Sequence, residues 1–177
     1  MRDPYHVVTA ELALLDRLAA FDPVLIGTPP LDIDTSSSDI DCACFATDPG
    51  VFVETVTSAY GQLPGFRRKT LPHLPAQALT VCFNYGGWGI ELFAQALPVS
   101  EQWGVRHFLV EERLLALAPE LRGAVRELKH AGLRTEPAFA QLLGLGGDPY
   151  QAVLALEHCS EAQLRELVAP LQRRPAP

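Results

Sequence analysis

The triplet Asp-Ile-Asp occurs twice in the first quarter of the chain, at Asp32–Asp34 and at Asp39–Asp41. Acids packed this closely repel one another unless water or a cation lies between them. Residues i and i+2 of a strand point to the same face, so either triplet can present two carboxylates side by side. The chemistry that this arrangement offers is oxygen-only coordination of Mg²⁺ or Mn²⁺.

The residues around the two triplets distinguish them. Asp32 and Asp34 lie between two prolines and three serines, which favours a loop whose acids bond local backbone amides. Asp39 and Asp41 are followed by the apolar sequence CACF, which predicts a buried strand. A metal site needs a rigid support, so we expect Asp39 and Asp41 to be the ligands. The alternative is that Asp39 caps a turn and Asp41 is a solvated edge residue.

Other residues could complete a site around this pair. Glu91 lies on an otherwise apolar strand, where a charge is costly unless it is paired or binds a metal. The alternative is that Glu91 points outward at a sheet edge. Gly27 and Thr28 end a short apolar run and offer backbone amides and a hydroxyl to phosphate groups. Ser38 closes a run of serines that either donate hydroxyls to phosphates or form a solvated loop.

The elements that must position these residues are predicted from periodicity and turn signals. A helical stripe covers residues 3–21 and is stopped by Asp22-Pro23. A second helix, with Asp48 as its cap, extends to about Tyr60. Gly86-Gly87 separates two β-rich runs, which predicts a hairpin. The expected strands are 24–27, 39–45, 65–71, 78–85 and 88–93.

The character of the chain changes at Ser100, which is a plausible cap for the first of five successive helices. The fourth of these begins with Asp148 as its cap and a proline at the first helical position. The predicted organisation is an α/β (α+β) core over residues 1–98, followed by a helical region over residues 99–177 packed on it as a single compact unit.

Bulk composition excludes several classes of protein. Hydrophobic residues make up 48% and charged residues 20% of the 177 residues, which is ordinary for a globular chain. The formal net charge of −7 argues against broad binding to a nucleic-acid backbone. No apolar run approaches the roughly 20 residues that span a bilayer, and the N-terminus does not resemble a signal peptide. We therefore expect a cytoplasmic protein with no membrane partner.

The spacing of the candidate residues resembles a known signature. Ile26-Gly27-Thr28, followed after ten residues by Asp39-Ile40-Asp41, is similar to the signature of the nucleotidyltransferase superfamily, which includes polymerase-β-like enzymes and small antibiotic and tRNA nucleotidyltransferases. Stretches such as GTPPLDIDTSSSDIDC and LKHAGLRTEPAFAQLLGLGGDPYQAVL resemble a small uncharacterised bacterial family with that fold. Thr28 replaces the usual Ser, Pro29-Pro30 replaces a common helix start, and Glu91 replaces the commoner Asp.

The resemblance implies a nucleotidyltransferase-like mixed sheet with flanking helices, and transfer of a nucleoside monophosphate from an NTP to a hydroxyl acceptor. It implies that Asp39, Asp41 and Glu91 are the catalytic residues and the ligands of Mg²⁺ or Mn²⁺. It places Gly27, Thr28 and Ser38 at the phosphates. Two alternatives keep the fold: a catalytically inactive nucleotide-binding or regulatory module, and a nucleotide phosphohydrolase.

The phosphates of an NTP also need cations from the protein. Arg67 and Lys69, from the basic run GFRRKT, are the nearest candidates in the sequence, although a solvated strand end is an equal interpretation. Lys129 and Arg134 are the candidates from the helical region, for the triphosphate or the acceptor. His107 is interpreted as an ordinary surface or core histidine.

Overall fold

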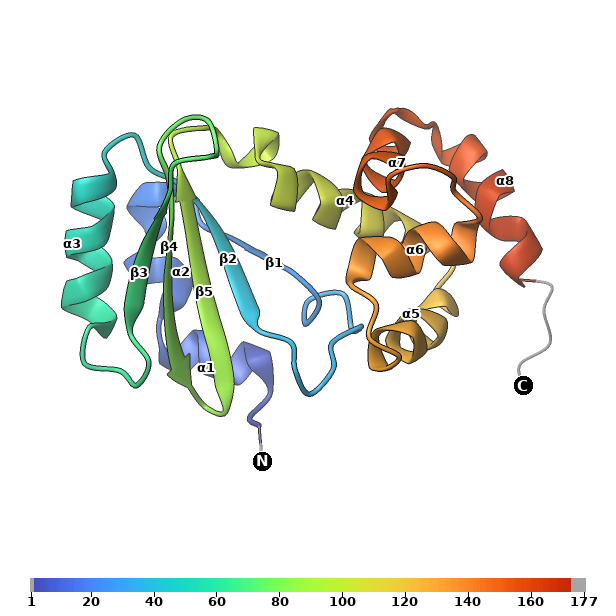
Figure 1. Ribbon diagram of the computed structural model, residues 1–177. Helices are drawn as coiled ribbons and strands as arrows, with labels where there is room; N and C mark the ends of the chain where they lie inside the picture. The colour runs from blue at the N-terminus through green and yellow to red at the C-terminus, as the bar shows by residue number, and fades with distance from the viewer. Residues whose placement is uncertain (1, 173–177) are drawn as a thin grey trace. The chain divides into compact units, whose positions relative to one another are not determined.

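The computed structural model describes residues 2–172, with a five-stranded mixed sheet in the N-terminal part of the chain (Figure 1). Strand order is β1-β2-β5-β4-β3, in which β2 and β5 are parallel and the other neighbours are antiparallel. The strands are β1 (Val24–Ile26), β2 (Ile40–Phe45), β3 (Arg67–Leu71), β4 (Ala78–Tyr85) and β5 (Trp88–Gln95). All five strands were predicted, with bounds that differ by at most two residues.

The β4–β5 connection confirms the predicted hairpin. Gly86 and Gly87 have φ values of 56° and 80°. Positive φ at both central residues is the requirement of the tight turn that matches the twist of two antiparallel strands, and glycine meets it without a steric cost.

The first predicted helix is broken in the structure. It consists of α1 (Tyr5–Glu11), α2 (Leu14–Arg17) and the 3₁₀ turn η1 (Ala19–Phe21). Ala13, between α1 and α2, has a φ of 47°, which is left-handed backbone and interrupts the helix. The prediction of one continuous helix was therefore wrong: Val8, Leu12 and Leu18 of its apolar stripe are buried, whereas Leu15 is exposed.

The helix α3 (Pro49–Tyr60) confirms its predicted cap. The Asp48 side chain accepts hydrogen bonds from the backbone N–H groups of Gly50 and Val51, at 2.8 and 3.3 Å. These are two of the donors that a helix start leaves without a partner inside the helix, so the cap stabilises the helix by about 1 kcal/mol.

The helices α1, α2 and α3 pack against one face of the sheet. Alternate residues of β2 and β5, such as Cys42 and Leu92, are buried in a core with Val8 of α1, Leu14 of α2 and Phe52 of α3. The residues between them in sequence point to the other face, because side chains alternate along a strand. Asp41 and Glu91 belong to this second face.

The remaining helices form a core of their own, into which the connection between β1 and β2 sends Leu31 and Ile33. This part of the chain contains α4 (Trp103–Leu117), α5 (Leu121–His130), α6 (Thr135–Leu143), α7 (Pro149–Ala155), η3 (Leu156–His158) and α8 (Glu161–Gln172). The five predicted helices are confirmed, and Asp148 caps α7 through the N–H of Gln151 at 2.9 Å. Ser100 does not cap α4 as predicted, because it lies inside the 3₁₀ turn η2 (Val99–Glu101).

The chain divides into two compact units: residues 1–29 with 38–105, and residues 30–37 with 106–177. The crossover 30–37 thus belongs with the helices, whereas the sequence predicted a single cut after residue 98. Within residues 2–172, no helix combines the length and the apolar character required to span a membrane.

Candidate functional site

A transverse row of side chains crosses the sheet on its second face. Asp41 of β2 is the register partner of Ile26 on one side and of Glu91 on the other. Glu91 is in turn the partner of Cys82 on β4, and Cys82 is the partner of Arg67 on β3. Register partners on neighbouring strands project to the same face, so the row brings two carboxylates, a thiol and a guanidinium to one surface.

Two glycines make room for Asp41 of β2 and for Asp39, which directly precedes this strand. A Cβ on Gly27, whose φ is 80°, would lie 2.3 Å from Oδ2 of Asp41. A Cβ on Gly89 would lie 2.3 Å from Oδ1 of Asp39. Each carboxylate therefore rests against a backbone segment where any side chain would displace it. This close approach explains why glycine is needed at the end of β1.

A hydrogen bond connects the segment before Asp39 to the residues that follow β1. The Thr28 hydroxyl donates a hydrogen bond to Oγ of Ser38 at 3.0 Å, so the two hydroxyls predicted to meet phosphates do lie together. The carbonyl of Ser38 accepts a hydrogen bond from Arg2 at 2.6 Å. Arg2 also stacks on the ring of Trp88, with its guanidinium carbon 3.1 Å from the ring centre. Arg2 thus supports the segment, a role that its sequence position did not indicate.

Glu91 is half-buried and has a close neighbour in Cys82. The Cys82 thiol donates a weak hydrogen bond to Oε2 of Glu91, with the two atoms 3.7 Å apart. Burial and, next in size, the negative charge of Glu91 raise the pKa of the Cys82 thiol. The thiol consequently stays protonated at neutral pH and acts as a donor to the carboxylate.

Arg67 and Lys69 are exposed on the edge strand β3 and share the face of Glu91, because alternate residues of one strand point to the same side. Lys129 and Arg134 belong to the other compact unit. There the charge of Lys129 acts on Glu111, and Arg134 is exposed directly before α6.

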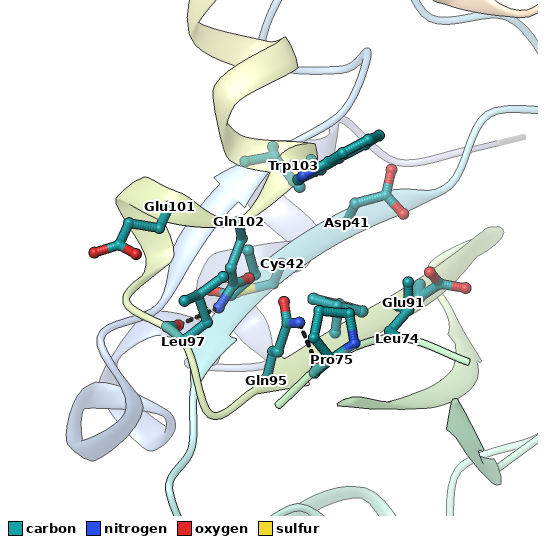
Figure 2. A pocket seen from close by; sticks show the side chains of 14 residues that line it. Asp41, Cys42, Leu74, Pro75, Glu91, Gln95, Leu97, Glu101, Gln102 and Trp103 are labelled. Carbon is teal, nitrogen blue, oxygen red and sulfur yellow. Dashed lines mark hydrogen bonds between the residues drawn. The ribbon is translucent and has the colours of Figure 1, made fainter. Parts of the chain in front are cut away.

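A pocket of about 550 Å³ opens on the same face as Asp41 and Glu91 (Figure 2). Its size is that of a small-molecule site. In Figure 2 the two carboxylates stand at one end, and Leu97 and Gln102 stand at the other. Gln102 donates hydrogen bonds to the carbonyls of Cys44 and Leu97, both at 2.9 Å.

Apolar surface also lines this pocket. Phe93, Leu74 and Trp103 contribute to the wall, and 55% of the Trp103 side chain is exposed. An exposed indole at the rim of a pocket offers a flat surface on which an aromatic ligand can stack. Sequence patterns did not single out Gln102, which lies between η2 and α4, or Trp103, which is the first residue of α4.

The fit of these residues to Mg²⁺ or Mn²⁺ rests on their donor chemistry. Asp39, Asp41 and Glu91 offer only carboxylate oxygens, which are the donors that hard divalent cations prefer. Within residues 2–172, however, their oxygens are not gathered within 4.8 Å of one another as one group. Asp39 is exposed and does not line the pocket, whereas Asp41 and Glu91 do. The assignment of all three residues as metal ligands stays a prediction.

The first Asp-Ile-Asp triplet lies outside this site. Its Asp32 belongs to the crossover and accepts a hydrogen bond from Arg126 at 3.1 Å, between two exposed side chains. The backbone of Asp32 has a φ of 55°, which is consistent with the predicted loop.

A group that the sequence analysis missed consists of His107, Glu111 and Glu136. One possible ligand atom from each lies within 4.8 Å of the other two. The signal in the sequence is the four-residue spacing of His107 and Glu111 in HFLVE, which places both on one side of a helix. Glu136 could not be joined to them before the helices were packed.

Comparison with curated proteins found no match. Solved structures of similar fold include a mutant Cid1 poly(U) polymerase bound to MgATP, with a TM-score of 0.54, 13% identity, and coverage of 85% of this chain and 47% of that chain. The same polymerase bound to MgGTP gives a TM-score of 0.51 at 15% identity, covering 81% of this chain and 46% of that one. The GLD-2/RNP-8 complex gives 0.50 at 14% identity, covering 96% and 64%.

This chain thus spans about half the length of the Cid1 structures. At such identities the likeness concerns the fold, and it confirms the predicted nucleotidyltransferase-like α/β class. One family profile also matches the sequence, over residues 7–156. Because that match extends over most of the sequence, the chain belongs to the family described as a domain of unknown function, DUF4269.

Proposed function

We propose that this protein is a metal-dependent nucleotidyltransferase that moves a nucleoside monophosphate from an NTP to a hydroxyl acceptor. The observation that carries the proposal is the register pair Asp41–Glu91, which lines a pocket of nucleotide size on the face of the sheet opposite the helix-covered core. The nucleotidyltransferase-like fold adds support, although a fold alone does not define an activity.

In this proposal Asp39, Asp41 and Glu91 would hold Mg²⁺ or Mn²⁺, and Glu91 would accept the proton of the acceptor hydroxyl. The bound ions would supply charge neutralisation for the phosphates and for the attacking and leaving oxygens. The backbone at Gly27 and the hydroxyls of Thr28 and Ser38 would contact the phosphates.

Arg67 and Lys69 are the proposed cations of the protein for the phosphate charge, because they share the face of Glu91. Lys129 and Arg134, which lie in the helical unit, stay predictions for the triphosphate or the acceptor. The acidic net charge of −7 favours recognition of a local hydroxyl group over wide contact with a nucleic-acid backbone.

A second candidate is a nucleotide-binding module without catalysis. The observation that favours it is the open spacing of Asp39, Asp41 and Glu91, whose oxygens are not gathered within 4.8 Å of one another. The first candidate requires side-chain rotation to bring them onto the ions when Mg·NTP binds, which is an ordinary event in active sites.

The test begins with calorimetric titration of Mg·NTP into the wild-type chain and into Asp41→Asn. We expect at least tenfold weaker binding in the variant, because one metal-binding charge is lost. Asp32→Asn is the matched control, since it removes the equivalent charge from the other triplet and asparagine tolerates positive φ. Equal binding in wild type and Asp41→Asn, or binding in neither, would exclude the metal site.

Incubation with an α-labelled NTP and candidate acceptors then separates the candidates. A transferase attaches the label to the acceptor and releases pyrophosphate, and Glu91→Gln should abolish this step while the variant remains folded. If the label remains in free NTP although the NTP binds tightly, the protein is the non-catalytic module. Label released as free nucleotide without acceptor indicates a phosphohydrolase.

A further inference from the structure

A compact group of three metal-binding side chains lies inside the helical unit. His107 and Glu111 are one helical turn apart on α4, and Glu136 lies in the first turn of α6. One nitrogen of the imidazole and one oxygen of each carboxylate all lie within 4.8 Å of one another. The group is separate from the pocket residues, and its members belong to the unit formed by residues 30–37 and 106–177.

The buried environment of the His107 side chain requires an explanation. Its side chain is only 6% exposed, and within the described residues neither Nδ1 nor Nε2 has a hydrogen-bond partner. A buried polar group without a partner costs about 1–3 kcal/mol of folding free energy. The ring contacts the edge of Tyr150, with 6.4 Å between ring centres, which supplies packing but no acceptor or donor for the nitrogens.

Glu111 is also unusually buried for an acidic residue, with only 4% of the residue exposed. Burial, followed by the negative charge of Glu136, raises the pKa of Glu111 well above its usual range. The charge of Lys129 lowers the pKa, but this effect is smaller than that of burial.

We infer that His107, Glu111 and Glu136 form the binding site of one divalent transition-metal ion, with an imidazole nitrogen and two carboxylate oxygens as ligands. One nitrogen and two oxygens match the donors of Zn²⁺ sites that keep a fourth position for water. Bonds of about 2.1 Å at tetrahedral angles place ligand atoms about 3.4 Å apart. The three ligand atoms, which lie within 4.8 Å of one another, would close to that separation around the ion.

The ion supplies the missing partner of His107 and the positive charge that two carboxylates need. It joins α4 to α6 within one unit, so it stabilises the folded state in proportion to its concentration and affinity. Arg106, the nearest guanidinium in sequence, does not compete for the carboxylates of the group, because it forms an ion pair with Glu157 through two hydrogen bonds.

The test uses the full chain, stripped of metal with a chelator and then titrated with Zn²⁺ by calorimetry and in thermal unfolding. We expect saturable binding of one Zn²⁺ and a rise in the unfolding temperature. Co²⁺ should give the visible absorption of a four-coordinate nitrogen–oxygen site. Glu136→Gln, at a half-buried position, and His107→Gln should each weaken Zn²⁺ binding at least tenfold and remove the temperature rise.

Glu112→Gln is the matched control, because Glu112 is an exposed neighbour of Glu111 on α4 and should bind Zn²⁺ as the wild type does. Asp41→Asn should also keep Zn²⁺ binding, which separates this site from the proposed nucleotide site. If His107→Gln does not fold, Glu136→Gln alone decides the result. No saturable binding by the wild type, or equal binding by wild type and Glu136→Gln, would overturn the inference.

Discussion

Asp41 on β2 and Glu91 on β5 are register partners across the parallel pair of strands at the centre of the sheet. Both side chains are half-buried and line the same pocket. Two carboxylates on adjacent strands of one face repel each other, which disfavours this pairing in a protein selected for stability alone. In the proposed function, a bound divalent cation would offset this repulsion.

The first prediction concerns Gly27, whose substitution by alanine should disturb the site through Asp41. The added Cβ would lie 2.3 Å from Oδ2 of Asp41, and the φ of 80° is strained for alanine. We expect at least tenfold weaker binding of Mg·NTP and a loss of about 1–2 kcal/mol in the free energy of unfolding. Calorimetric titration and chemical denaturation measure the two effects.

Gly123→Ala provides the control for this substitution. A Cβ on Gly123 meets no atom within 4 Å, and the residue lies inside α5. Alanine there should raise stability by roughly 0.5–1 kcal/mol and leave nucleotide binding unchanged. Unaltered Mg·NTP affinity in Gly27→Ala would show that the close approach of Gly27 and Asp41 has no part in binding.

The second prediction concerns Trp103 at the rim of the pocket. Its indole is 55% exposed, whereas the other tryptophan, Trp88, is 5% exposed. We expect Mg·NTP to change the fluorescence of Trp103 by stacking of the base, and Trp103→Phe to remove the change. Trp103→Ala should weaken binding about tenfold, since stacking on an aromatic side chain contributes about 1–3 kcal/mol per base. A fluorescence change that persists in Trp103→Phe would contradict the assignment.

The third prediction concerns the pH dependence of stability. The Tyr60 hydroxyl donates a buried hydrogen bond to the carbonyl of Leu12 at 3.1 Å. Burial raises the pKa of Tyr60 from 10.0 to about 12 in the folded chain. The unfolded chain loses the proton first, so the stabilisation is fully present below pH 10.0 and is lost as the pH rises toward about 12.

Tyr60→Phe isolates this contribution. The variant should be less stable at neutral pH, because the Leu12 carbonyl loses its donor. Its stability should fall less steeply than that of the wild type between pH 10 and pH 12, as followed by urea denaturation at each pH. Parallel pH profiles for the two proteins would assign the loss of stability to other groups.

The strands, the hairpin and most helices followed from local patterns, because alternation, glycine pairs and aspartate caps act over a few residues. Local patterns failed where packing decided the backbone. The first helix is interrupted at Ala13 although its apolar stripe continues, and Ser100 lies in a 3₁₀ turn although it has the residue type of a cap. In both cases tertiary packing overrides a weak local preference.

The sequence by itself determined which residues carry charge on otherwise apolar strands, and therefore that Asp41 and Glu91 needed a reason to be there. Only the tertiary structure decided that the two are register partners, that Asp32 belongs with the helical unit, and that Glu136 meets His107 and Glu111. The physical reason is the distance along the chain over which each effect acts. Alternation and helical periodicity specify the face of one element, whereas the meeting of two elements depends on how their apolar faces are buried together.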